Sequence, residues 1–317
     1  MKVLFVSSGN SKTGMISFVK SQGESLLQNN ISLEYFSIIG KGFSGYFKNA
    51  RILKKHLKQN HYNIIHAHYA LSAWVALFAS RKIPIVVSYM GSDTYGSYNK
   101  NGKLKWKSLL NIMNAFLLQP FVNKIIVKSQ NLSKYVLFKS KMHIVPNGVN
   151  LSKFSTLNSA SSLKERKSEK NILFLANTIN SRKNFRLLKE AMILINNPNY
   201  KVISPYPLDH NQVQEFYNNA DVFVLTSFNE GSPNVIKEAM ACNCPIVATD
   251  VGDIRWLFGE TEGCFITSFK PEDVAVKIQD AINFGTRTKG RERLIHIGLD
   301  SDSVAKKLIN IYKSCIN

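Results

Sequence analysis

The sequence predicts an α/β protein built from two doubly wound domains. Its 317 residues exceed the usual limit of a single hydrophobic core. Short apolar runs alternate with longer amphipathic segments along the chain, which is typical of βαβ units. A polar stretch rich in Ser, Lys and Asn, residues 152–170, interrupts this alternation near the middle. These observations predict one parallel sheet on each side of a linker.

Eleven short runs have the apolar character of buried parallel strands. The first half carries Val3–Val6, Leu33–Ile38, Ile64–Ala67, Ile85–Tyr89, Ile125–Lys128 and His143–Val145. The second half carries Ile172–Ala176, Lys201–Ser204, Val222–Thr226, Ile246–Thr249 and Cys264–Thr267. We therefore expect a first domain over residues 1–150, a linker over 151–170, a second domain over 171–302 and a final helix over 303–317.

The positive charge of the chain is concentrated in its first half. Residues 1–150 contain 20 Lys and Arg residues but only three acids, Glu24, Glu34 and Asp93, which gives a net charge of +17. The remaining residues contribute +3 of the total of +20. Such asymmetry indicates a polyanionic partner, namely nucleic acid, an anionic membrane or a phosphate-rich substrate. Nucleic acid is disfavoured because no zinc-finger, RRM or helix-turn-helix signature is present.

Cysteine usage and hydropathy indicate a cytoplasmic protein. Four cysteines are too few for a disulfide framework in a chain of this size. Cys242-Asn-Cys244 is one residue too tight for the usual zinc-binding pair. The run Met1–Val6 is too short for the apolar region of a signal peptide, and no run approaches the roughly 20 apolar residues of a transmembrane helix.

The segment 228–240 carries the most specific pattern in the chain. After the strand-like run 222–226, Ser232 is a suitable N-cap and Pro233 fits the first helical position. We expect the N–H groups of Asn234 and Val235 to point outward at the positive end of the helix dipole. A phosphate or diphosphate would bind well there. Glu230 then precedes the helix, and Glu238 lies about two turns inside it.

This segment resembles the Glu-x7-Glu signature of the retaining group 1, family 4 glycosyltransferases, and the match continues through Ala239–Asp253. The run His143–Asn150 resembles the end of the family's first domain. The resemblance implies the GT-B fold, two Rossmann-like domains facing a cleft, with a terminal helix that packs back toward the first domain. It also implies that Glu230 contacts the donor sugar and Glu238 the ribose hydroxyls. The diphosphate of a nucleotide sugar would lie against the helix start, at Gly231, Ser232, Asn234 and Val235.

A basic pair follows the first strand of the second half. Lys183 and Arg182 resemble the family's basic pair, which neutralises the charge on the departing nucleotide, with Lys183 the stronger candidate. The family turn usually begins with Gly-Arg, whereas this chain has Ala176-Asn177. Because no Asp-x-Asp motif accompanies the turn, we expect fixed cations rather than a metal ion to stabilise the leaving group, and no cofactor. The alternative is a solvated basic turn.

Two parts of the first half are candidates for the acceptor side. Glycines 9 and 14 flank the turn after the first strand, where they would allow close backbone approach to a ligand. The resemblance assigns this loop to the cleft, although an ordinary βα loop fits its sequence equally well. His68 and Asp93 are candidates for holding the acceptor hydroxyl. The family usually has a histidine where this chain has Met90. His66 alternates with His68, so either histidine is equally a candidate for a hydrogen-bonded core residue.

A basic and aromatic segment indicates an anionic membrane surface. Trp106 is flanked by Lys103, Lys105 and Lys107 and is followed by a strongly apolar helix. A second basic helix is expected over 47–57. The alternative is that the apolar stripes form core and that the lysines are merely solvated.

Together these patterns predict a retaining, metal-independent glycosyltransferase. It would move a sugar from a nucleotide sugar to an acceptor hydroxyl, which the basic first half suggests belongs to a lipid-linked glycan in cell-surface polysaccharide synthesis. We expect a cytoplasmic protein on the inner face of the cell membrane. Two alternatives are a nucleotide-sugar-binding subunit without turnover and a GT-B nucleotide-sugar epimerase.

Overall fold

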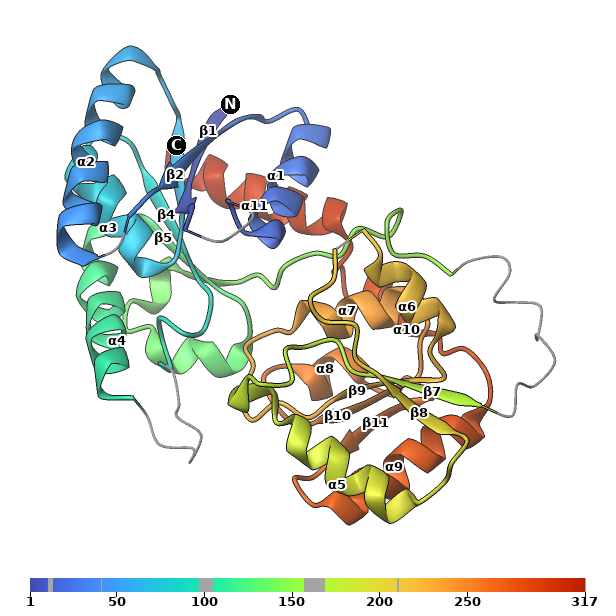
Figure 1. The fold of residues 1–317 in the computed structure, drawn as a ribbon. Helices are drawn as coiled ribbons and strands as arrows, with labels where there is room; N and C mark the ends of the chain where they lie inside the picture. Colours follow the sequence, from blue (N-terminus) through green and yellow to red (C-terminus); the bar gives the residue numbers. More distant parts are fainter. Residues whose placement is uncertain (11–13, 41, 97–104, 157–168, 210, 317) are drawn as a thin grey trace. The chain divides into compact units, whose positions relative to one another are not determined.

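A computed structural model describes residues 1–10, 14–40, 42–96, 105–156, 169–209 and 211–316 of the protein (Figure 1). Its contacts divide the chain into two compact units. The first comprises Met1–Gly148 and Ser301–Asn317, and the second comprises Val149–Asp300. The middle of the predicted linker, residues 157–168, and the predicted membrane contact Lys103 lie outside the described residues.

The first unit contains a six-stranded parallel sheet with the order β2-β1-β3-β4-β5-β6. Its strands are β1 (Lys2–Ser8), β2 (Ser32–Ile38), β3 (Ile64–His68), β4 (Ile85–Tyr89), β5 (Lys124–Val127) and β6 (Met142–Ile144). All six runs predicted from the sequence are present, with ends that differ by no more than two residues. Residues 3–6 of β1 are fully buried on both faces of the sheet, as expected for a parallel strand covered by helices on each side.

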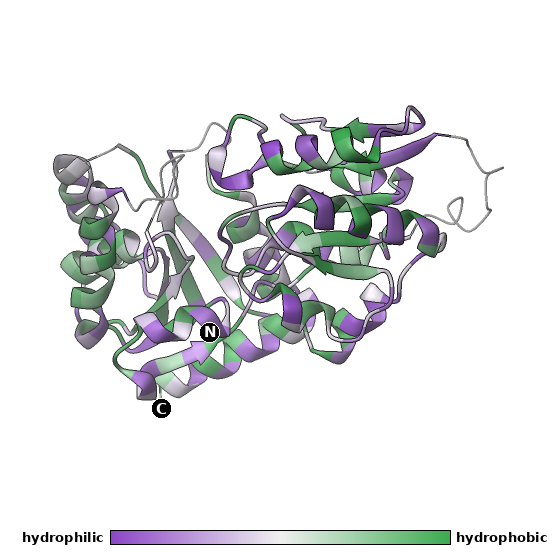
Figure 2. Cartoon of the chain, turned by 90° about the horizontal axis from the view of Figure 1, so that it is seen from below, coloured by the Kyte–Doolittle hydropathy of each residue, from purple (hydrophilic) through white to green (hydrophobic). Residues whose placement is uncertain are grey.

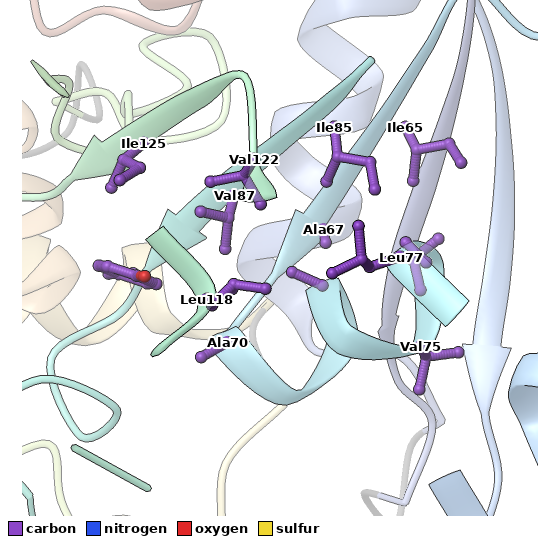
Figure 3. Close-up of a cluster of buried hydrophobic side chains, with 14 of the residues drawn as sticks. Ile65, Ala67, Ala70, Val75, Leu77, Ile85, Val87, Leu118, Val122 and Ile125 are labelled. Carbon is purple, nitrogen blue, oxygen red and sulfur yellow. The ribbon is translucent and has the colours of Figure 1, made fainter. Parts of the chain in front are cut away.

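Helices cover both faces of this sheet (Figure 1). Two of them, α1 (Ser17–Gln28) and α11 (Ser301–Ile316), pack against each other. The others are α2 (Gly42–Gln59), α3 (Ala70–Ala79) and α4 (Trp106–Leu118), and α3 contacts both α2 and α4. Alternate strand residues such as Ile65 and Val87 form a core with Leu118 of α4 (Figure 3). The apolar runs therefore form strands because each is covered on both sides.

The C-terminal helix α11 is tied to the sheet by a buried hydrogen bond. The hydroxyl of Tyr312 lies 2.6 Å from Nδ1 of His66 on β3. Burial, followed by the proximity of His68 and Lys128, lowers the pKa of His66 well below its usual value, so the imidazole is neutral. Asn29 at the end of α1 also donates to Asp302 of α11. The last 17 residues of the chain therefore complete the first unit.

The second unit contains a five-stranded parallel sheet with the order β11-β10-β9-β7-β8. Its strands are β7 (Lys170–Leu173), β8 (Tyr200–Ile203), β9 (Val222–Leu225), β10 (Ile246–Thr249) and β11 (Cys264–Thr267). Each was predicted, and the largest difference is the end of β7, three residues earlier than expected. The helices are α5 (Phe185–Ile195), α6 (Val213–Asn219), α7 (Asn234–Ala241), α8 (Ile254–Phe258), α9 (Pro271–Phe284) and α10 (Gly290–His296).

One face of the second sheet is covered by α5 and α9, which contact each other and share a core with β7, β9 and β10. The chain enters and leaves this unit at neighbouring points, because Val149 forms a bridge with Asp300. Arg291 holds the entering segment by donating to the carbonyls of Leu151 and Phe154. The two parallel α/β sheets confirm the predicted fold class.

Strand order locates where each sheet should bind ligands. In the first sheet, the chain runs outward from β1 to β2 and then returns to the other side of β1 as β3. In the second sheet, β7, β8 and β9 follow the same pattern. Ligands of open α/β sheets bind at the carboxyl ends of the strands that flank such a reversal. Ligands are therefore expected at the turns after β1 and β3 in the first sheet and at those after β7 and β9 in the second.

No helix within the described residues is long and apolar enough to cross a membrane.

The hydrogen bond between Tyr312 and His66 yields a stability prediction. Replacing Tyr312 by Phe leaves a buried imidazole nitrogen without that partner, which should lower the free energy of unfolding by roughly 1–3 kcal/mol. Urea unfolding of the whole chain measures this loss. Ile316→Ala, at the exposed end of the same helix, should change stability by less than about 0.5 kcal/mol. Equal effects of the two substitutions would contradict the role given to the hydrogen bond.

Candidate functional site

The turns after β7 and β9 are joined by hydrogen bonds. The hydroxyl of Thr226 donates to the carbonyls of Lys183 (3.0 Å) and Asn184 (2.9 Å). The N–H of Phe228 donates to the carbonyl of Arg182 at 2.9 Å. Asn184 adopts a left-handed conformation, which Asn tolerates better than most residues. The basic turn and the loop that carries Glu230 are therefore fixed side by side at the point where the strand order reverses.

Glu230 forms ion pairs with both members of the basic pair. Lys183 Nζ lies 2.6 Å from Oε1 of Glu230, and a terminal nitrogen of Arg182 lies 3.2 Å from Oε2. The side chain of Glu230 is 10% exposed, whereas those of Lys183 and Arg182 are 19% and 39% exposed. The carboxylate therefore lies behind the two cations. Because an ammonium has three N–H donors and a guanidinium has five, both retain donors for another anion.

Burial and the neighbouring positive charges act in opposite directions on the pKa of Glu230. Burial alone would raise it, but the charges of Lys183 and Arg182 outweigh burial and leave the pKa below its usual value. Glu230 is therefore ionised at neutral pH, and the cluster of three side chains carries a net charge of +1. The sequence placed these residues near one another but did not predict the ion pairs.

The start of α7 differs from the prediction by one residue. Helical geometry begins at Asn234, and Pro233 occupies the N-cap position with an extended backbone. The predicted N-cap, Ser232, lies one residue before the observed one, and its hydroxyl accepts a hydrogen bond from Lys237 Nζ at 3.2 Å. Ser232 is drawn into this bond because the ammonium of Lys237 is buried on the same helix and needs a hydrogen-bond acceptor. Asn234 and Val235 still lie in the first turn, with Gly231 just before it.

A buried ionic cluster lies under the start of α7. Lys237 and Asp253 are both buried and close enough for each charge to stabilise the other. Burial lowers the pKa of Lys237 to about 8, despite the nearby carboxylates of Asp253 and Glu238. Burial likewise raises the pKa of Asp253 to about 6, while Lys237 and the Ser232 hydroxyl act in the opposite direction. The two carboxylate oxygens of Asp253 have no partner within hydrogen-bond distance among the described residues, so Asp253 acts on Lys237 through its charge rather than through a direct contact.

Backbone packing at Gly252 joins the loop after β10 to the loop that carries Glu230. A Cβ atom at this position would lie 2.4 Å from the carbonyl oxygen of Gly231 and 2.9 Å from that of Glu230. Gly252 also has a φ of +67°, which favours glycine. The loop after β10 can therefore support the Glu230 loop only because residue 252 lacks a side chain.

Glu238 lies on α7 beside Tyr217. The Tyr217 hydroxyl donates to the carbonyl of Val235 at 2.9 Å and lies 3.4 Å from Oε2 of Glu238. Burial, followed by the Glu238 charge, raises the pKa of Tyr217 well above its usual value, so the phenol remains protonated. Both glutamates therefore belong to the second unit, on the loop before α7 and on the helix itself.

The predicted glycines of the first unit have local structural roles. A Cβ atom at Gly9 would lie 2.7 Å from Ile39 and 2.9 Å from Ser37, so Gly9 allows the turn to pack against the end of β2. Gly14 has a φ of +76°, with nothing within 4 Å of the place where a Cβ would be. Residues 11–13, between the two glycines, lie outside the described part of the chain.

The two histidines of β3 differ in their contacts. His66 is satisfied, since Nδ1 meets Tyr312 and Nε2 meets the hydroxyl of Ser88 at 2.8 Å. His68 stacks on His66 with ring centroids 4.5 Å apart, but its own ring nitrogens are buried without a hydrogen-bond partner among the described residues. Burial and then Lys128 lower the pKa of His68 well below its usual value. His66 is thus a hydrogen-bonded core residue, and His68 carries the unused polar atoms.

Asp93 is occupied by backbone N–H groups. Its Oδ1 accepts from Met90 (2.9 Å) and Gly91 (3.0 Å), and its Oδ2 accepts from Ala70 at the start of α3 (3.3 Å). Burial raises its pKa to about 6 against the effect of these donors. Tyr69 has a φ of +74° and a ψ of 149°, a strained conformation for a residue other than glycine. Asp93 therefore organises the turn that holds this strained residue.

Among the described residues, no group of three or more His, Cys, Asp or Glu side chains is arranged to hold a metal ion. The spacing Asp-x-Asp does occur, at Asp300-Ser301-Asp302. However, Asp302 pairs with Lys306 and accepts from Asn29, while Asp300 belongs to the bridge with Val149. All four cysteines are free thiols, and Cys242 and Cys244 are buried.

Sequence reasoning missed Lys237, Asp253, Tyr217 and Lys128. One signal could have revealed Lys237. The helix 234–241 is short and its residues from 236 onward are buried, so a lysine there requires an internal partner. Tyr217 and Lys128 lie on elements distant in sequence from the residues that they affect, and only folding brings them together.

Lys237 yields a pH prediction. Its pKa is lower in the fold than in the unfolded chain, so the folded protein binds fewer protons between about pH 8 and 10.5. Lys237 should therefore add to the free energy of unfolding as the pH rises across that window, by about 1.4 kcal/mol for each unit of pKa difference. The thiols of Cys242, Cys244 and Cys264, whose pKa values burial raises, act in the opposite direction, so the contribution of Lys237 is measured as a difference between variants. In chemical denaturation across this pH range, the wild type and the exposed control Lys189→Met should both gain stability relative to Lys237→Met. Parallel pH profiles of the three proteins would contradict the assignment.

Comparison with known proteins identifies the family. Residues 22–153 match the family described as Glycosyltransferase Family 4, and residues 199–283 match Glycosyl transferases group 1. The chain is 25% identical over 230 residues to TuaC of Bacillus subtilis (strain 168), a glycosyltransferase assigned to teichuronic acid biosynthesis. That alignment covers 64% of this chain and 57% of the relative.

Solved structures share the fold over nearly the whole chain. Sucrose-phosphate synthase from Thermosynechococcus elongatus matches with a TM-score of 0.79 and 18% identity, covering 99% of this chain and 98% of that one. Anabaena HepE, solved with UDP and glucose, matches with a TM-score of 0.70 and 15% identity over 99% of both chains. The two sheets, the Glu230–Glu238 segment and the two family matches agree, and the chain belongs to the group 1, family 4 glycosyltransferases.

Proposed function

We propose that the protein is a retaining glycosyltransferase that moves a sugar from a nucleotide-sugar donor to an acceptor hydroxyl. The observation that carries this proposal is the position of Lys183, Arg182 and Glu230. They lie at the carboxyl ends of β7 and β9, where an α/β sheet binds ligands, and their net charge is positive. The nearby first turn of α7 adds the positive end of a helix dipole.

The proposed chemistry uses this positive charge to stabilise the leaving group. As the bond between the anomeric carbon and the phosphate oxygen breaks, negative charge grows on the departing diphosphate. The outward N–H groups of Lys183 and Arg182 meet that charge without a metal ion. The acceptor oxygen bonds to the anomeric carbon on the face that the diphosphate leaves, and its proton passes to the departing phosphate oxygen. The anomeric configuration is therefore retained.

The donor would contact the second unit in two regions. Gly231, Ser232, Asn234 and Val235 provide the helix start for the diphosphate. We assign the donor sugar to Glu230 and the ribose hydroxyls to Glu238. Support for the first assignment is the rigid loop that Gly252 and the Lys237–Asp253 pair hold in place.

The acceptor would bind at the carboxyl edge of the first sheet, between Gly9 and Gly14 on one side and His68 on the other. His68 has two ring nitrogens without a hydrogen-bond partner among the described residues, and because its side chain is fully buried, the acceptor would reach it only through a movement of the turn after β3. Asp93 would act by shaping the neighbouring turn, because backbone groups already occupy its carboxylate. The similarity to a teichuronic acid glycosyltransferase supports a cell-surface glycan, and the +17 charge of residues 1–150 supports one linked to a lipid in an anionic membrane.

The same charge supports a peripheral location on the inner face of the cell membrane, with no anchor required. Each basic residue near an anionic surface contributes about 1 kcal/mol of attraction.

Nucleotide release separates the candidate functions. The protein is incubated with a panel of nucleotide sugars, including UDP-glucose, with and without membrane extract as the acceptor source. A transferase releases the nucleotide and places the sugar on an acceptor. A binding subunit binds the donor without releasing nucleotide, whereas an epimerase converts the sugar. Either of the last two results would overturn the proposal.

Two alanine substitutions should affect different steps. Glu238→Ala should weaken donor binding by about 1.5–3 kcal/mol, the usual value of hydrogen bonds to a charged group. Glu230→Ala should lower kcat more than donor affinity, because it orients the reacting sugar and both cations. Calorimetric donor binding and steady-state kinetics measure the two effects. Glu190→Ala, which removes a half-exposed carboxylate paired with Arg186 on α5, should match the wild type. Wild-type rates in both site variants would show that the site lies elsewhere.

Transfer should persist in excess chelator. Lys183, Arg182 and the helix start provide the positive charge that a metal would otherwise supply. The measurement compares initial rates in EDTA with rates in Mg²⁺ or Mn²⁺. Strict dependence on either ion would contradict the mechanism.

A further inference from the structure

Helix α4 is apolar on its exposed side as well as on its buried side. Ser108, Ala115 and Leu118 are buried against the first unit. Large apolar side chains on the rest of the helix and the turn after it are 50–70% exposed, and we call this surface the α4 face. It consists of Trp106, Leu109, Leu110, Met113, Leu117 and Phe121. Contiguous exposed patches of large apolar side chains are typical of interaction sites, so this surface indicates a partner.

The α4 face continues onto α3. The ring of Trp74 lies 5.9 Å from that of Phe121 and 5.6 Å from that of Phe78, measured between centroids. The indole N–H of Trp74 donates to the carbonyl of Asn114 on α4. Phe78 is itself more than half exposed. The exposed apolar residues therefore form one continuous surface rather than isolated side chains.

Basic side chains adjoin the same surface. Lys141 donates to the carbonyls of Pro120 (2.8 Å) and Val122 (2.9 Å), on either side of Phe121. Residues 105–142 contain seven lysines and no acid, and of these lysines Lys128 is buried and takes no part in this surface. In Figure 2, which views the molecule from below, green hydrophobic residues dominate the helices at the left, in the unit that holds both chain ends. An apolar centre with a cationic margin is the pattern of a helix that lies in a membrane interface.

We propose that the α4 face inserts into the boundary between headgroups and acyl chains of an anionic bilayer. The lysines would then contact lipid phosphates, and Trp106 would lie at headgroup depth. A second copy of the chain is a poorer occupant, because the shared interface would bring two strongly basic units together. The inference rests on the proposed membrane location but not on the transfer chemistry. Insertion of the α4 face adds an apolar component to the binding of the protein to the membrane. Binding through charge alone would be largely abolished by high salt.

The test uses the whole chain with vesicles of phosphatidylglycerol, of phosphatidylcholine and of their mixture. The variant Leu109→Asn/Met113→Asn/Leu117→Asn changes the α4 face. The matched control Ile193→Asn/Leu194→Asn/Val276→Asn changes three exposed apolar residues of the second unit. Circular dichroism checks that each variant folds. Co-sedimentation is measured at about 0.1 M and about 1 M salt, where attraction between exposed charges is largely screened.

Wild type and control should bind phosphatidylglycerol vesicles at low salt and retain weaker binding at high salt. The α4-face variant should bind at least about tenfold more weakly, because its three asparagine side chains no longer bury apolar area in the bilayer. Wild-type tryptophan fluorescence should shift to the blue on vesicle binding, and Trp106→Phe should remove most of that shift. This second readout does not depend on the triple variant folding.

Three results would overturn the inference. They are equal binding by the triple variant and the control, the absence of a Trp106 shift, and a dimer without vesicles that only the triple variant disrupts. The last result would assign the surface to a second copy of the chain. Nucleotide release by the same samples keeps the two proposals distinct. Vesicle binding without nucleotide release would contradict the transferase and leave this surface in place, whereas release without vesicle binding would do the reverse.

Discussion

The ion pairs of Glu230 with Lys183 and Arg182 are the interaction on which the candidate site depends. Two cations and one carboxylate from separate turns meet at the reversal point of the second sheet. Without the carboxylate, the two cations would repel each other and spread into solvent. With it, they stay in one place and keep their outward donors for a ligand. The same contact therefore fixes the two loops and leaves a net positive charge where a departing diphosphate would need it.

This arrangement requires a rigid support, which the buried cluster beneath α7 provides. Lys237 and Asp253 are costly to bury, and their opposite pKa shifts show that the fold disfavours each isolated charge. Buried pairs of this kind contribute little to stability compared with apolar residues of similar size. Their value here is geometric, since Lys237 holds Ser232 by a hydrogen bond and the charge of Asp253, on the loop after β10, helps to keep the ammonium in place. Gly252 also supports the Glu230 loop, because without a side chain it lets the loop after β10 pack directly against the backbone of Glu230 and Gly231.

The sequence was sufficient to predict the strands and the fold class and to single out the residues around Glu230 as a candidate site. Strands such as β10 and β11 matched to the residue, because an apolar run bounded by turns has few other structures available. The predicted start of α7 was one residue too early. Ser232 accepts a hydrogen bond from the buried Lys237, and this interaction outweighed its preference for the N-cap position. Contacts across the chain, such as those of Tyr312 with His66 and of Tyr217 with Glu238, have no local signature. The exposure of the α4 face was equally hidden, because an apolar helix looks the same in sequence whether its second side is covered or not.

A crystal structure of the protein with a bound nucleoside diphosphate would show directly where the leaving group binds. We expect the diphosphate at the start of α7, with Lys183 Nζ and the Arg182 guanidinium within hydrogen-bond distance of its oxygens and Glu238 on the ribose. Density for the diphosphate in the second unit but away from Lys183, or a ribose that does not contact Glu238, would contradict this assignment.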